Sequence, residues 1–342
     1  MPVDFTLSTE QSSLQQAARS FAERELRKIN GLISKLATPD ERFNATRPAY
    51  AAMSQAGFVK ALIPREYGGT DLPTLEFAIA AEELAAVDIN VPTTLLATML
   101  GLEPILLFGS DEQKQRFLPD FAQDGTDRLA AWAFTEVGGG ANFDCPDPSA
   151  GVKTCARREG NEWVINGHKH HTTNGTGWNG EGPHLMSVLC RTDLSKSPAE
   201  SLAVIVVPGG TPGVRITETL DMIGHRAVSS PVLEFKEVRV PVGNMIGVPG
   251  DGARIAPAVF SRTAALIGAA CTGVMRAAFD HAYEFSKKDR RLGSVPVLEH
   301  QNVGYMLADI KARVEASRYL AWKACHYLDA TNREGEELAI IA

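Results

Sequence analysis

The stretch that decides the fold is Trp132–Gly140, with the sequence WAFTEVGGG. Its first part, Trp132–Thr135, has the aromatic and β-branched composition of a short strand. Three glycines follow at Gly138–Gly140, and a run without side chains lets backbone N–H groups approach a ligand closely. No helical pattern follows them, so the run lacks the strand–turn–helix context of a dinucleotide-binding fingerprint. Taken alone, it is better explained as a loop between two strands than as a ligand site.

More strand patterns follow toward the C-terminus, and none of them alternates with a helix. Glu159–Asn161 has the composition of a tight turn and predicts a hairpin between the runs on either side. The strand candidates are Lys153–Arg158, Glu162–Ile165, the β-branched run Leu202–Val207 and the alternating run Val232–Val240. Because parallel strands need crossover connections, usually helices, this order predicts an antiparallel β-domain.

Helical patterns lie on both sides of these strands. On the N-terminal side, the periodicity is helical from Ser8 to about Gly125. On the C-terminal side, Ala253–Asp289 and His300–Tyr327 predict two long helices. The sequence therefore predicts an α+β fold of three domains, namely an N-terminal helical domain (1–125), a middle β-domain (126–245) and a C-terminal helical bundle (246–342).

The predicted C-terminal bundle stops in the middle of a pattern. A third helix begins near Glu334, and the sequence ends at Ala342 after only a few more residues. A helix that starts and stops in mid-pattern is not a natural domain end. We therefore expect this bundle to be truncated.

Composition limits the classes of function. The chain has 342 residues, 44% of them hydrophobic, and a net charge of −7. An acidic balance argues against a nucleic-acid partner, because phosphate binding needs a basic surface. Five cysteines without metal-ligand spacing predict reduced thiols in an intracellular protein. With neither a signal-peptide pattern nor an uninterrupted apolar run of about 18 residues, we expect a cytoplasmic protein with no membrane partner, while mitochondrial and peroxisomal locations stay open.

The order of the domains and four local motifs resemble the acyl-CoA dehydrogenase superfamily. Trp132–Gly140 is similar to the strand and glycine turn that bind flavin in this family, and Asn166–Gly175 is similar to its second flavin segment. Phe235–Pro241 resembles the run that closes the β-domain, and Leu298–Gln301 resembles the start of the helix that reaches a neighbouring subunit's FAD. These similarities cover essentially the whole chain, in order and at the right separations.

Within the superfamily, the chain most resembles the nitroalkane oxidases. Acyl-CoA dehydrogenases usually have Gly-Ser-Asp where this chain has Gly-Ala-Asn. The motifs that carry the resemblance are Arg42–Pro48, Gly140–Asn142, Glu162–Ile165, Gly177–Trp178 and Lys288–Ser294. A generic acyl-CoA dehydrogenase fits the same fold.

The resemblance implies that FAD is the cofactor and marks residues that would hold it. It places Thr135 near the pyrimidine edge of the flavin and Thr173 near N5, the atom that accepts hydride. A donor there stabilises negative charge on the reduced ring; the alternative is two ordinary strand threonines. The other contacts implied in the two flavin segments are Trp132, Phe134, Gly140, Ala141, Asn142, His171, Asn174 and Gly175.

His171 departs from the family pattern, which usually has a tryptophan packed on the flavin at this place. Histidine is smaller and titratable, so it can change the flavin's potential or its access. His168 and His170 lie close by, but their spacing suits one strand rather than a closed ligand set, and no acidic partner accompanies them. We therefore expect no metal site.

A second set of cofactor residues is implied near the C-terminus. Arg291, His300 and Gln301 match positions that hold the FAD pyrophosphate and adenine across a dimer interface in the family. Arginine suits a bidentate phosphate contact. The resemblance thus implies a homodimer or homotetramer. Without it, Arg290 and Arg291 are a solvated pair of loop charges.

Thr263 is the one residue to which the resemblance gives a catalytic role. Some acyl-CoA dehydrogenases have their glutamate base at this helical position, whereas nitroalkane oxidases have a hydroxyl residue that hydrogen-bonds the catalytic aspartate. Thr263 fits that supporting role about as well as it fits a packed helix threonine. The family's base comes from a later helical segment, beyond Ala342, so we name no base in this chain.

The implied function is that of an FAD-dependent oxidoreductase. A proton α to an activating group is removed, and the electrons pass to flavin N5. The substrate is a nitroalkane or an acyl-CoA thioester, and the residues do not decide between them. Two alternatives stay open: a catalytically degenerate FAD-binding homologue that lacks the C-terminal base, and a flavin monooxygenase on the same fold.

Overall fold

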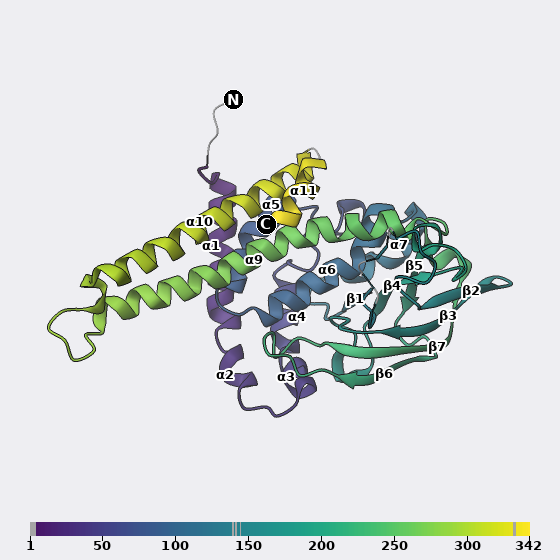
Figure 1. Ribbon diagram of the computed structural model, residues 1–342, viewed down its shortest axis with the longest axis horizontal. Coiled ribbons are helices and arrows are strands. Elements are labelled where there is room, and N and C mark those ends of the chain that lie inside the picture. The colour runs from purple at the N-terminus through teal and green to yellow at the C-terminus, as the bar shows by residue number, and fades with distance from the viewer. Residues whose placement is uncertain (1–4, 139, 141, 144, 331–332) are drawn as a thin grey trace. The chain divides into compact units, whose positions relative to one another are not determined.

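The computed structural model describes residues 5–138, 140, 142–143, 145–330 and 333–342. The chain divides into two compact units. One, the sheet unit, comprises Lys28–Leu72 and Thr93–Thr263, and the other, the helical unit, comprises Met1–Arg27, Pro73–Pro92 and Ala264–Ala342. Figure 1 labels the elements of both.

Within its described residues, the sheet unit contains eight strands. They are β1 (Ala130–Ala133), β2 (Cys155–Glu159), β3 (Glu162–Lys169), β4 (Leu185–Arg191), β5 (Leu202–Pro208), β6 (Val214–Thr219), β7 (Pro231–Pro241) and β8 (Met245–Ile246). Their order is β6-β7-β3-β2-β4-β5-β8, with β1 paired to β4. The predicted hairpin is confirmed, because Glu159 pairs with Glu162 across the turn at Gly160 and Asn161.

The sheet is mixed rather than wholly antiparallel. Most of its pairings are antiparallel, as predicted, but β1 runs parallel to β4, and β2 meets β4 in parallel at Cys155 and Arg191. The starts of β1 and β4 are tied together, since the His184 amide donates to the Leu129 carbonyl at 2.9 Å. The direction of this pairing depends on contacts between distant segments and has no local sequence signal.

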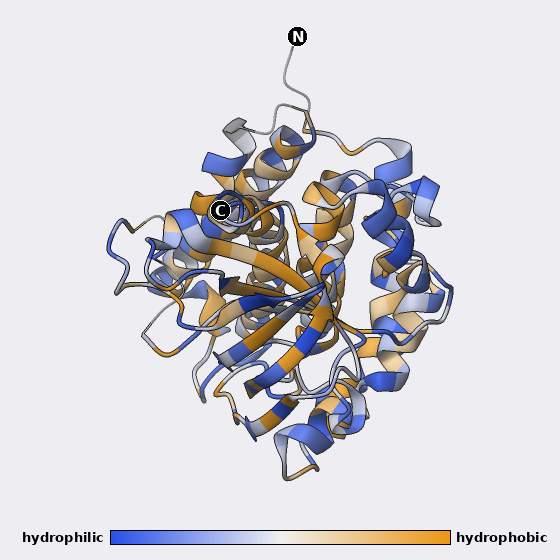
Figure 2. Cartoon of the chain, turned by 90° about the vertical axis from the view of Figure 1, so that its right-hand side faces the viewer, coloured by the Kyte–Doolittle hydropathy of each residue, from blue (hydrophilic) through white to orange (hydrophobic). Residues whose placement is uncertain are grey.

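Strands β4 and β5 are buried on both faces, because hydrophobic layers lie on either side of them. One layer joins alternate residues of β1, β4 and β5 to the helices of the same unit, and it includes Trp132, Leu185, Leu189, Val204, Val206, Leu102 and Ile105. The other joins the intervening residues to β3 and β7, and it includes Ala131, Met186, Val188, Ile205, Ile165, Leu233 and Phe235. Figure 2 shows strands that are hydrophobic along most of their length beside strands on which hydrophobic and hydrophilic residues alternate.

Helices of the sheet unit begin with recognisable caps. The Thr38 hydroxyl accepts from the Glu41 amide while the Glu41 carboxylate accepts from the Thr38 amide, and Ser110 and Gln113 repeat this capping box at α7. The helices are α2 (Ile29–Ile33), α3 (Pro39–Ala45), α4 (Arg47–Gln55), α6 (Asn90–Phe108), α7 (Asp111–Phe117), α8 (Pro198–Ser201) and the first turns of α9 (Gly252–Lys288).

The helical unit is built around a buried ionic network. Glu82 and Glu83 are only 1% and 2% exposed. Arg19 and Arg276 each make two hydrogen bonds of 2.7–3.0 Å to Glu83, and Arg318 donates to Glu82 at 2.9–3.1 Å. This network joins the main helices of the unit, which are α1 (Thr9–Phe21), α5 (Thr74–Ala85), α9 and α10 (Gln301–Ala330); α11 (Arg333–Ile341) follows them.

Across the described part of the chain, two helices, α6 and α9, are long and apolar enough by length and composition to cross a membrane. The most apolar window of α6 is 72% buried inside the protein, and that of α9 is 44% buried. A helix in the core of a globular domain passes the same test, so these two helices carry little weight as membrane spans.

Helix α6 lies directly against β1 at Gly101. A Cβ atom at this residue would lie 2.5 Å from the Ala131 nitrogen and 2.8 Å from the Ala130 carbonyl carbon. The Ser187 hydroxyl of β4 also donates to the Gly101 carbonyl at 2.8 Å. Only glycine permits this approach, which places the preceding turn of α6 next to the end of β1.

Replacing Gly101 with alanine should lower the free energy of unfolding by about 2 kcal/mol or more, because the new methyl group would overlap the β1 backbone. Urea denaturation measures the loss. The matched control is Gly304→Ala in α10, where an added Cβ meets nothing within 4 Å; it should be neutral or stabilising by roughly 0.5–1 kcal/mol. Equal effects of the two substitutions would contradict the close packing at Gly101.

Candidate functional site

The site is built where β1 leaves the sheet. Trp132 and Phe134 point into the layer between the sheet and the helices and are 6% and 9% exposed. The strand ends at Ala133, and the next residue but one, Thr135, is exposed. Its carbonyl accepts a hydrogen bond of 2.8 Å from the His170 amide. The end of β1 is therefore tied to the segment that follows β3.

The segment after β3 supplies the second half of the site. Within it, His171 has a φ of +54°, a left-handed conformation that few residues other than glycine adopt. The exposed imidazole lies with Nδ1 3.3 Å from the Ser230 hydroxyl. Thr173 follows two residues later and is half-buried. This sharp change of direction turns the chain out of the sheet just beside Thr135.

A cavity of about 120 Å³ lies between these two segments. Five of the residues predicted to contact flavin line it, namely Trp132, Phe134, Thr135, His171 and Thr173. The sequence prediction missed the other three lining residues, Ala97 and Leu100 from α6 and Phe260 from the first turns of α9. These are apolar helix residues, and nothing in their local pattern distinguishes a cavity wall from an ordinary core.

The apolar wall of the cavity is mostly aromatic. The Phe134 and Phe260 rings meet edge to face, with centroids 5.0 Å apart and planes at 88°. The Trp132 ring stacks near Phe134 at 5.8 Å and meets Phe260 edge-on at 6.4 Å. Such packing gives a stiff surface against which a flat ring can lie. Thr135, His171 and Thr173 are the polar residues of the lining.

Asn174 and Gly175 are buried, and their contacts hold the local structure. The buried Asn174 amide nitrogen lies within 2.9–3.1 Å of the Thr94 carbonyl, the Thr98 hydroxyl and the Ala130 carbonyl. A Cβ at Gly175 would lie 2.7 Å from both Pro231 and the Thr172 carbonyl. Neither residue is among those that line the cavity, so their part in the site is to shape the turn that carries Thr173.

The glycine turn is described only in part. Gly140 is buried with a φ of +140°, and a Cβ there would lie 3.5 Å from the Phe134 ring. Asn142 is exposed. Ala141, which was also predicted to contact FAD, lies outside the described residues. Neither Gly140 nor Asn142 lines the cavity.

Thr263 is buried on α9, one turn after Phe260. Its hydroxyl oxygen lies 3.2 Å from the Val259 carbonyl and 3.2 Å from the Phe260 carbonyl, so its proton is directed to its own helix. The lone pairs of the oxygen remain for a donor from elsewhere. Thr263 is not among the residues that line the cavity.

Arg291, His300 and Gln301 belong to the helical unit, and all three are exposed. Arg291 has a φ of +46°, and its backbone amide donates to the Asp289 carboxylate at 2.8 Å. Its guanidinium lies 5.0 Å from the centre of the Phe285 ring and 3.3 Å from Asp289. The loop thus presents a positive group at the surface of this unit.

The three histidines of the second segment have separate surroundings. His168 is exposed and lies 4.0 Å from Glu234, and the His171 ring contacts Ser230. Across the part of the chain that the structure describes, no group of three or more His, Cys, Asp or Glu side chains could hold a metal ion.

Arg42, from the motif Arg42–Pro48, holds the loop that carries Ser230. The side chain is 1% exposed, and it donates to the Arg226 carbonyl at 2.8 Å and to the Asp221 carboxylate at 2.5 Å. The loop between β6 and β7 is therefore fixed from its middle, and its last residues reach His171.

Three buried polar atoms of the two segments make no hydrogen bond within the described residues. They are the Trp132 indole nitrogen, the Thr172 hydroxyl and the Asn174 carbonyl oxygen. Buried polar atoms in folded proteins are almost always paired, so such a group of exceptions points to a ligand or ordered water. A flavin ring can be held by a flat aromatic wall and by hydrogen-bond donors. The site offers such a wall, hydroxyls and an indole donor that makes no bond, so these residues fit a flavin ring.

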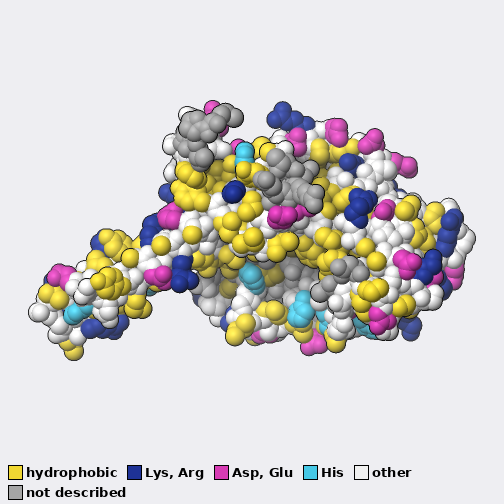
Figure 3. Space-filling view, turned by 45° about the horizontal axis from the view of Figure 1, so that its top comes forward, with side chains coloured by type: hydrophobic (Ala, Val, Ile, Leu, Met, Phe, Trp, Pro, Cys, Tyr) yellow, Lys and Arg dark blue, Asp and Glu magenta, His cyan; other side chains and the backbone are white. Residues whose placement is uncertain are grey.

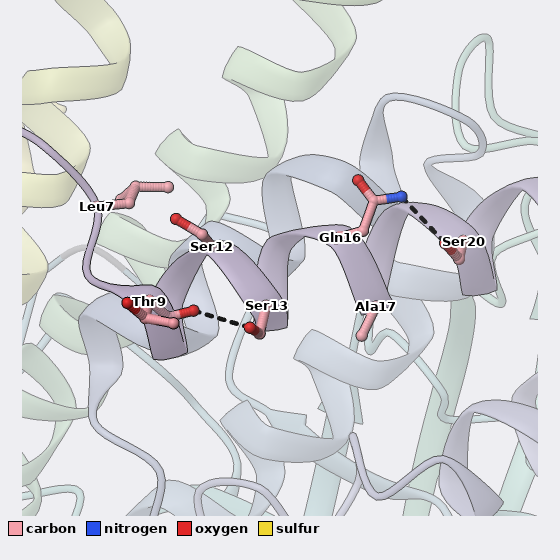
Figure 4. Close-up of a pocket in the computed structure, with 7 residues that line it drawn as sticks. All are labelled: Leu7, Thr9, Ser12, Ser13, Gln16, Ala17 and Ser20. Atoms are coloured by element: carbon pink, nitrogen blue, oxygen red, sulfur yellow. Dashed lines mark hydrogen bonds between the residues drawn. The ribbon is translucent and has the colours of Figure 1, made fainter.

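Two other hollows have few of the side chains that catalysis requires. One in the sheet unit has a volume of about 290 Å³ and is lined largely by glycine and proline of the loops around Gly180–Pro183 and Pro208–Gly213. One in the helical unit lies along α1 (Figure 4), and its lining is Leu7, Thr9, Ser12, Ser13, Gln16, Ala17 and Ser20. Glu181 is the one ionisable group in either lining.

A buried carboxyl lies one turn beyond the α6 wall of the cavity. Glu103 is 0% exposed, and neither of its oxygens makes a hydrogen bond within the described residues. Arg262 lies 3.3 Å from one oxygen, but this contact does not have hydrogen-bond geometry. Burial raises the pKa of Glu103 above its ordinary value, and the charge of Arg262 only partly opposes this shift.

A second buried carboxyl lies beside the cavity and has the opposite character. Glu136 follows Thr135 and forms an ion pair with Lys169 at 2.7 Å. Burial opposes ionisation of Glu136, but the charge of Lys169 and several hydrogen bonds together hold the pKa of this carboxyl below its ordinary value. Glu136 is therefore ionised in the folded protein.

Family models of acyl-CoA dehydrogenases match three consecutive parts of the chain. The N-terminal domain model matches residues 8–124, the middle domain model residues 131–238 and the C-terminal domain model residues 250–341. The fold, with a mixed sheet between helical segments, agrees with these matches. The chain belongs to the acyl-CoA dehydrogenase family.

Within this family, the similarity to nitroalkane oxidases is high. The chain is 38% identical to nitroalkane oxidase of Podospora anserina over an alignment of 343 positions, which covers 96% of this chain and 79% of the relative. A solved structure of "the flavoprotein nitroalkane oxidase" has a TM-score of 0.93 and 35% identity, covering 99% of this chain and 83% of that one. The short-chain specific acyl-CoA dehydrogenase of Rattus norvegicus is 30% identical over 92% of this chain and 72% of its own length.

Replacing Glu103 with glutamine should change how stability depends on pH. Because the folded protein binds the Glu103 proton more tightly than the unfolded chain, the wild type loses stability as the pH rises from about 4.5 through the raised pKa. The variant lacks this loss. Its stability relative to the wild type should improve as the pH rises above the ordinary pKa of glutamate, by about 1.4 kcal/mol for each unit of the shift.

Urea denaturation at several pH values measures this difference. The control is Glu112→Gln, which removes an exposed carboxyl of the same unit. Stability profiles of wild type and Glu103→Gln that run parallel across this range would show that Glu103 is not destabilised by burial.

Proposed function

We propose that this protein is an FAD-dependent oxidoreductase that oxidises a carbon acid, with nitroalkanes as the leading substrate class. The observation that carries the proposal is the cavity. Residues from two well-separated segments of the sequence, each similar to a flavin-binding motif of the family, line one aromatic and hydroxyl-bearing site. The 38% identity to a nitroalkane oxidase supports the substrate class.

Bound FAD would supply a two-electron acceptor at N5. The residues of the chain can assist in three ways. The Thr173 and Thr135 hydroxyls can donate to a ring that becomes negative. The Trp132 indole N–H, which makes no bond among the described residues, can donate as well. The Phe134 and Phe260 rings, which meet edge to face, would exclude water from their side of the cavity and so strengthen these interactions. We keep Thr263 as the proposed supporting hydroxyl, since its lone pairs can accept a hydrogen bond.

Acyl-CoA dehydrogenase activity is the second candidate. It is favoured by the 30% identity to a short-chain specific acyl-CoA dehydrogenase over nearly the whole chain. Both reactions begin with the removal of a proton α to an activating group, and both reduce the cofactor. They differ in the group that activates the proton, so the substrate separates them.

The purified chain, supplied with FAD, should show flavin absorption bands that bleach when the preformed nitroethane anion, which needs no base, is added without oxygen. A medium-chain acyl-CoA should leave the bands unchanged. The control substrate is 2-methyl-2-nitropropane, which has no α-hydrogen and should not react. Neutral nitroethane adds a second comparison, because it must first lose its α-proton and so tests proton removal as well as electron acceptance.

Each outcome has a distinct meaning. Bleaching by the acyl-CoA alone would establish the second candidate instead. Bleaching by the anion but not by neutral nitroethane would assign the defect to proton removal. A folded protein that binds no flavin would contradict the proposal as a whole.

We extend the proposal to a homodimer or homotetramer in which Arg291, His300 and Gln301 contact the FAD of a neighbouring copy. All three are exposed on the helical unit. Large apolar side chains are exposed on α9 and α10, the helices before and after Arg291, among them Val274, Phe285, Tyr305, Met306 and Ile310. Figure 3 shows hydrophobic side chains on one face of the molecule. Exposed apolar surface of this kind favours association with another chain.

Replacing Arg291 with alanine should reduce FAD affinity by about tenfold while the protein stays folded, because one charge-assisted phosphate contact contributes roughly 1.5 kcal/mol or more. Fluorescence titration with FAD measures the change. Lys288→Ala is the matched control, since Lys288 is an exposed cation at the end of α9, just before this loop. Equal affinities of the two variants would contradict the role of Arg291.

A further inference from the structure

Lys169 is a fully buried cation at the end of β3. Its side chain is 0% exposed. Lysine is almost never fully buried unless its charge is paired, because removing an ammonium group from water is strongly unfavourable. The bonds that hold this charge therefore indicate what the residue does.

The Lys169 ammonium group has two partners, and both belong to the segment that follows β1. It donates to the Phe134 carbonyl at 2.9 Å and to the Glu136 carboxylate at 2.7 Å. Glu136 in turn accepts from the Lys153 amide at 2.6 Å and the Thr154 amide at 3.0 Å. One buried ion pair thus joins the end of β1, the end of β3 and the start of β2.

The two walls of the cavity continue directly from this pair. Thr135 lies between the two residues that receive the Lys169 bonds, and His171 and Thr173 follow Lys169 by two and four residues. The His170 amide adds a bond of 2.8 Å to the Thr135 carbonyl. A shift of the ion pair would therefore change the separation between Thr135 and Thr173.

We propose that Lys169 and Glu136 are positioning residues that fix Thr135 relative to Thr173, and so set how tightly and in what orientation the cavity holds its flavin ring. The identity of the ligand rests on the function proposed above. The fixing of the two segments rests only on the contacts of the ion pair.

A charged pair at this place contributes a defined geometry between its atoms more than it contributes net stability. A buried ion pair contributes little more than an apolar pair of similar volume, because desolvation offsets the attraction. It does, however, hold its atoms at defined distances and angles. An uncharged pair should therefore keep the fold while loosening the two hydroxyl-bearing segments.

The test uses the double substitution Lys169→Met with Glu136→Gln. Either single change leaves a buried charge without its partner and would unfold much of the protein. The double variant removes both charges, and the glutamine oxygen can still accept a backbone amide. The control is Asn244→Ala, which removes other hydrogen bonds of the sheet unit: the 2.8 Å bond that Asn244 donates to the Val206 carbonyl and the 3.1 Å bond that it accepts from Arg116.

Two measurements are made on the wild type, the double variant and the control. Fluorescence titration should show FAD binding to the double variant weakened by about tenfold, with altered fine structure of the visible flavin bands, and no change for the control. Hydrogen exchange without FAD should be faster in the double variant in peptides covering 134–138 and 168–176, but unchanged in β4 and β5.

The two readings separate the inference from the proposed function. Unchanged exchange in both peptides would overturn the positioning role, whether or not FAD binds. Faster exchange with unchanged FAD affinity and spectrum would show that the pair orders the segments without affecting the ligand, which also overturns it. A wild type that binds no FAD would refute the proposed function, and the exchange measurement would still decide the role of Lys169 in fixing the two segments.

Discussion

The structure of the site depends on the contact between helix α6 and strand β1 at Gly101. A side chain at this residue would lie 2.5 Å from the Ala131 nitrogen, so the helix and the strand meet backbone to backbone. This contact places Ala97 and Leu100, in the preceding turn, on the cavity beside Trp132. Asn174 reinforces the arrangement, because its amide reaches the Thr94 carbonyl of α6 and the Ala130 carbonyl of β1 together. The cavity thus lies next to the close contact between α6 and β1.

The position of the polar groups follows from where the strands end. Within a sheet, backbone groups pair with neighbouring strands and side chains alternate between two buried layers. Strand β1 ends at Ala133 and β3 ends at Lys169, so the residues beyond them are released from both constraints. Thr135 and Thr173 lie just beyond these ends. The sheet thereby provides rigidity up to the site, and the short segments beyond it provide the hydroxyls, which is how binding groups are usually presented on a rigid scaffold.

Much of this could be predicted from local sequence, and the rest depends on distant contacts. The hairpin at Gly160, the runs of β5 and β7 and the long helices follow from turn chemistry and periodicity. The flavin motifs predicted five lining residues, because those residues lie in two short segments. Phe260 could not be found, since a phenylalanine of an apolar helix has the same pattern whether it faces a core or a cavity. The parallel pairing of β1 with β4 could not be predicted either, because local composition does not indicate the direction in which two strands pair. The roles of Arg291, His300 and Gln301 stay predictions.

The two buried carboxyls of the sheet unit show how the fold controls charge near the cavity. Glu136 accepts bonds from Lys169 and from two backbone amides, and these hold the pKa of the carboxyl below its ordinary value, so its charge is matched locally. Glu103 has no such donors, and burial raises its pKa, which favours the neutral form. A ring that gains electrons becomes more negative, and an unpaired anion nearby would oppose that change. One carboxyl is compensated by its partners, and burial shifts the other toward its neutral form, so the fold limits the negative charge beside the proposed site of reduction.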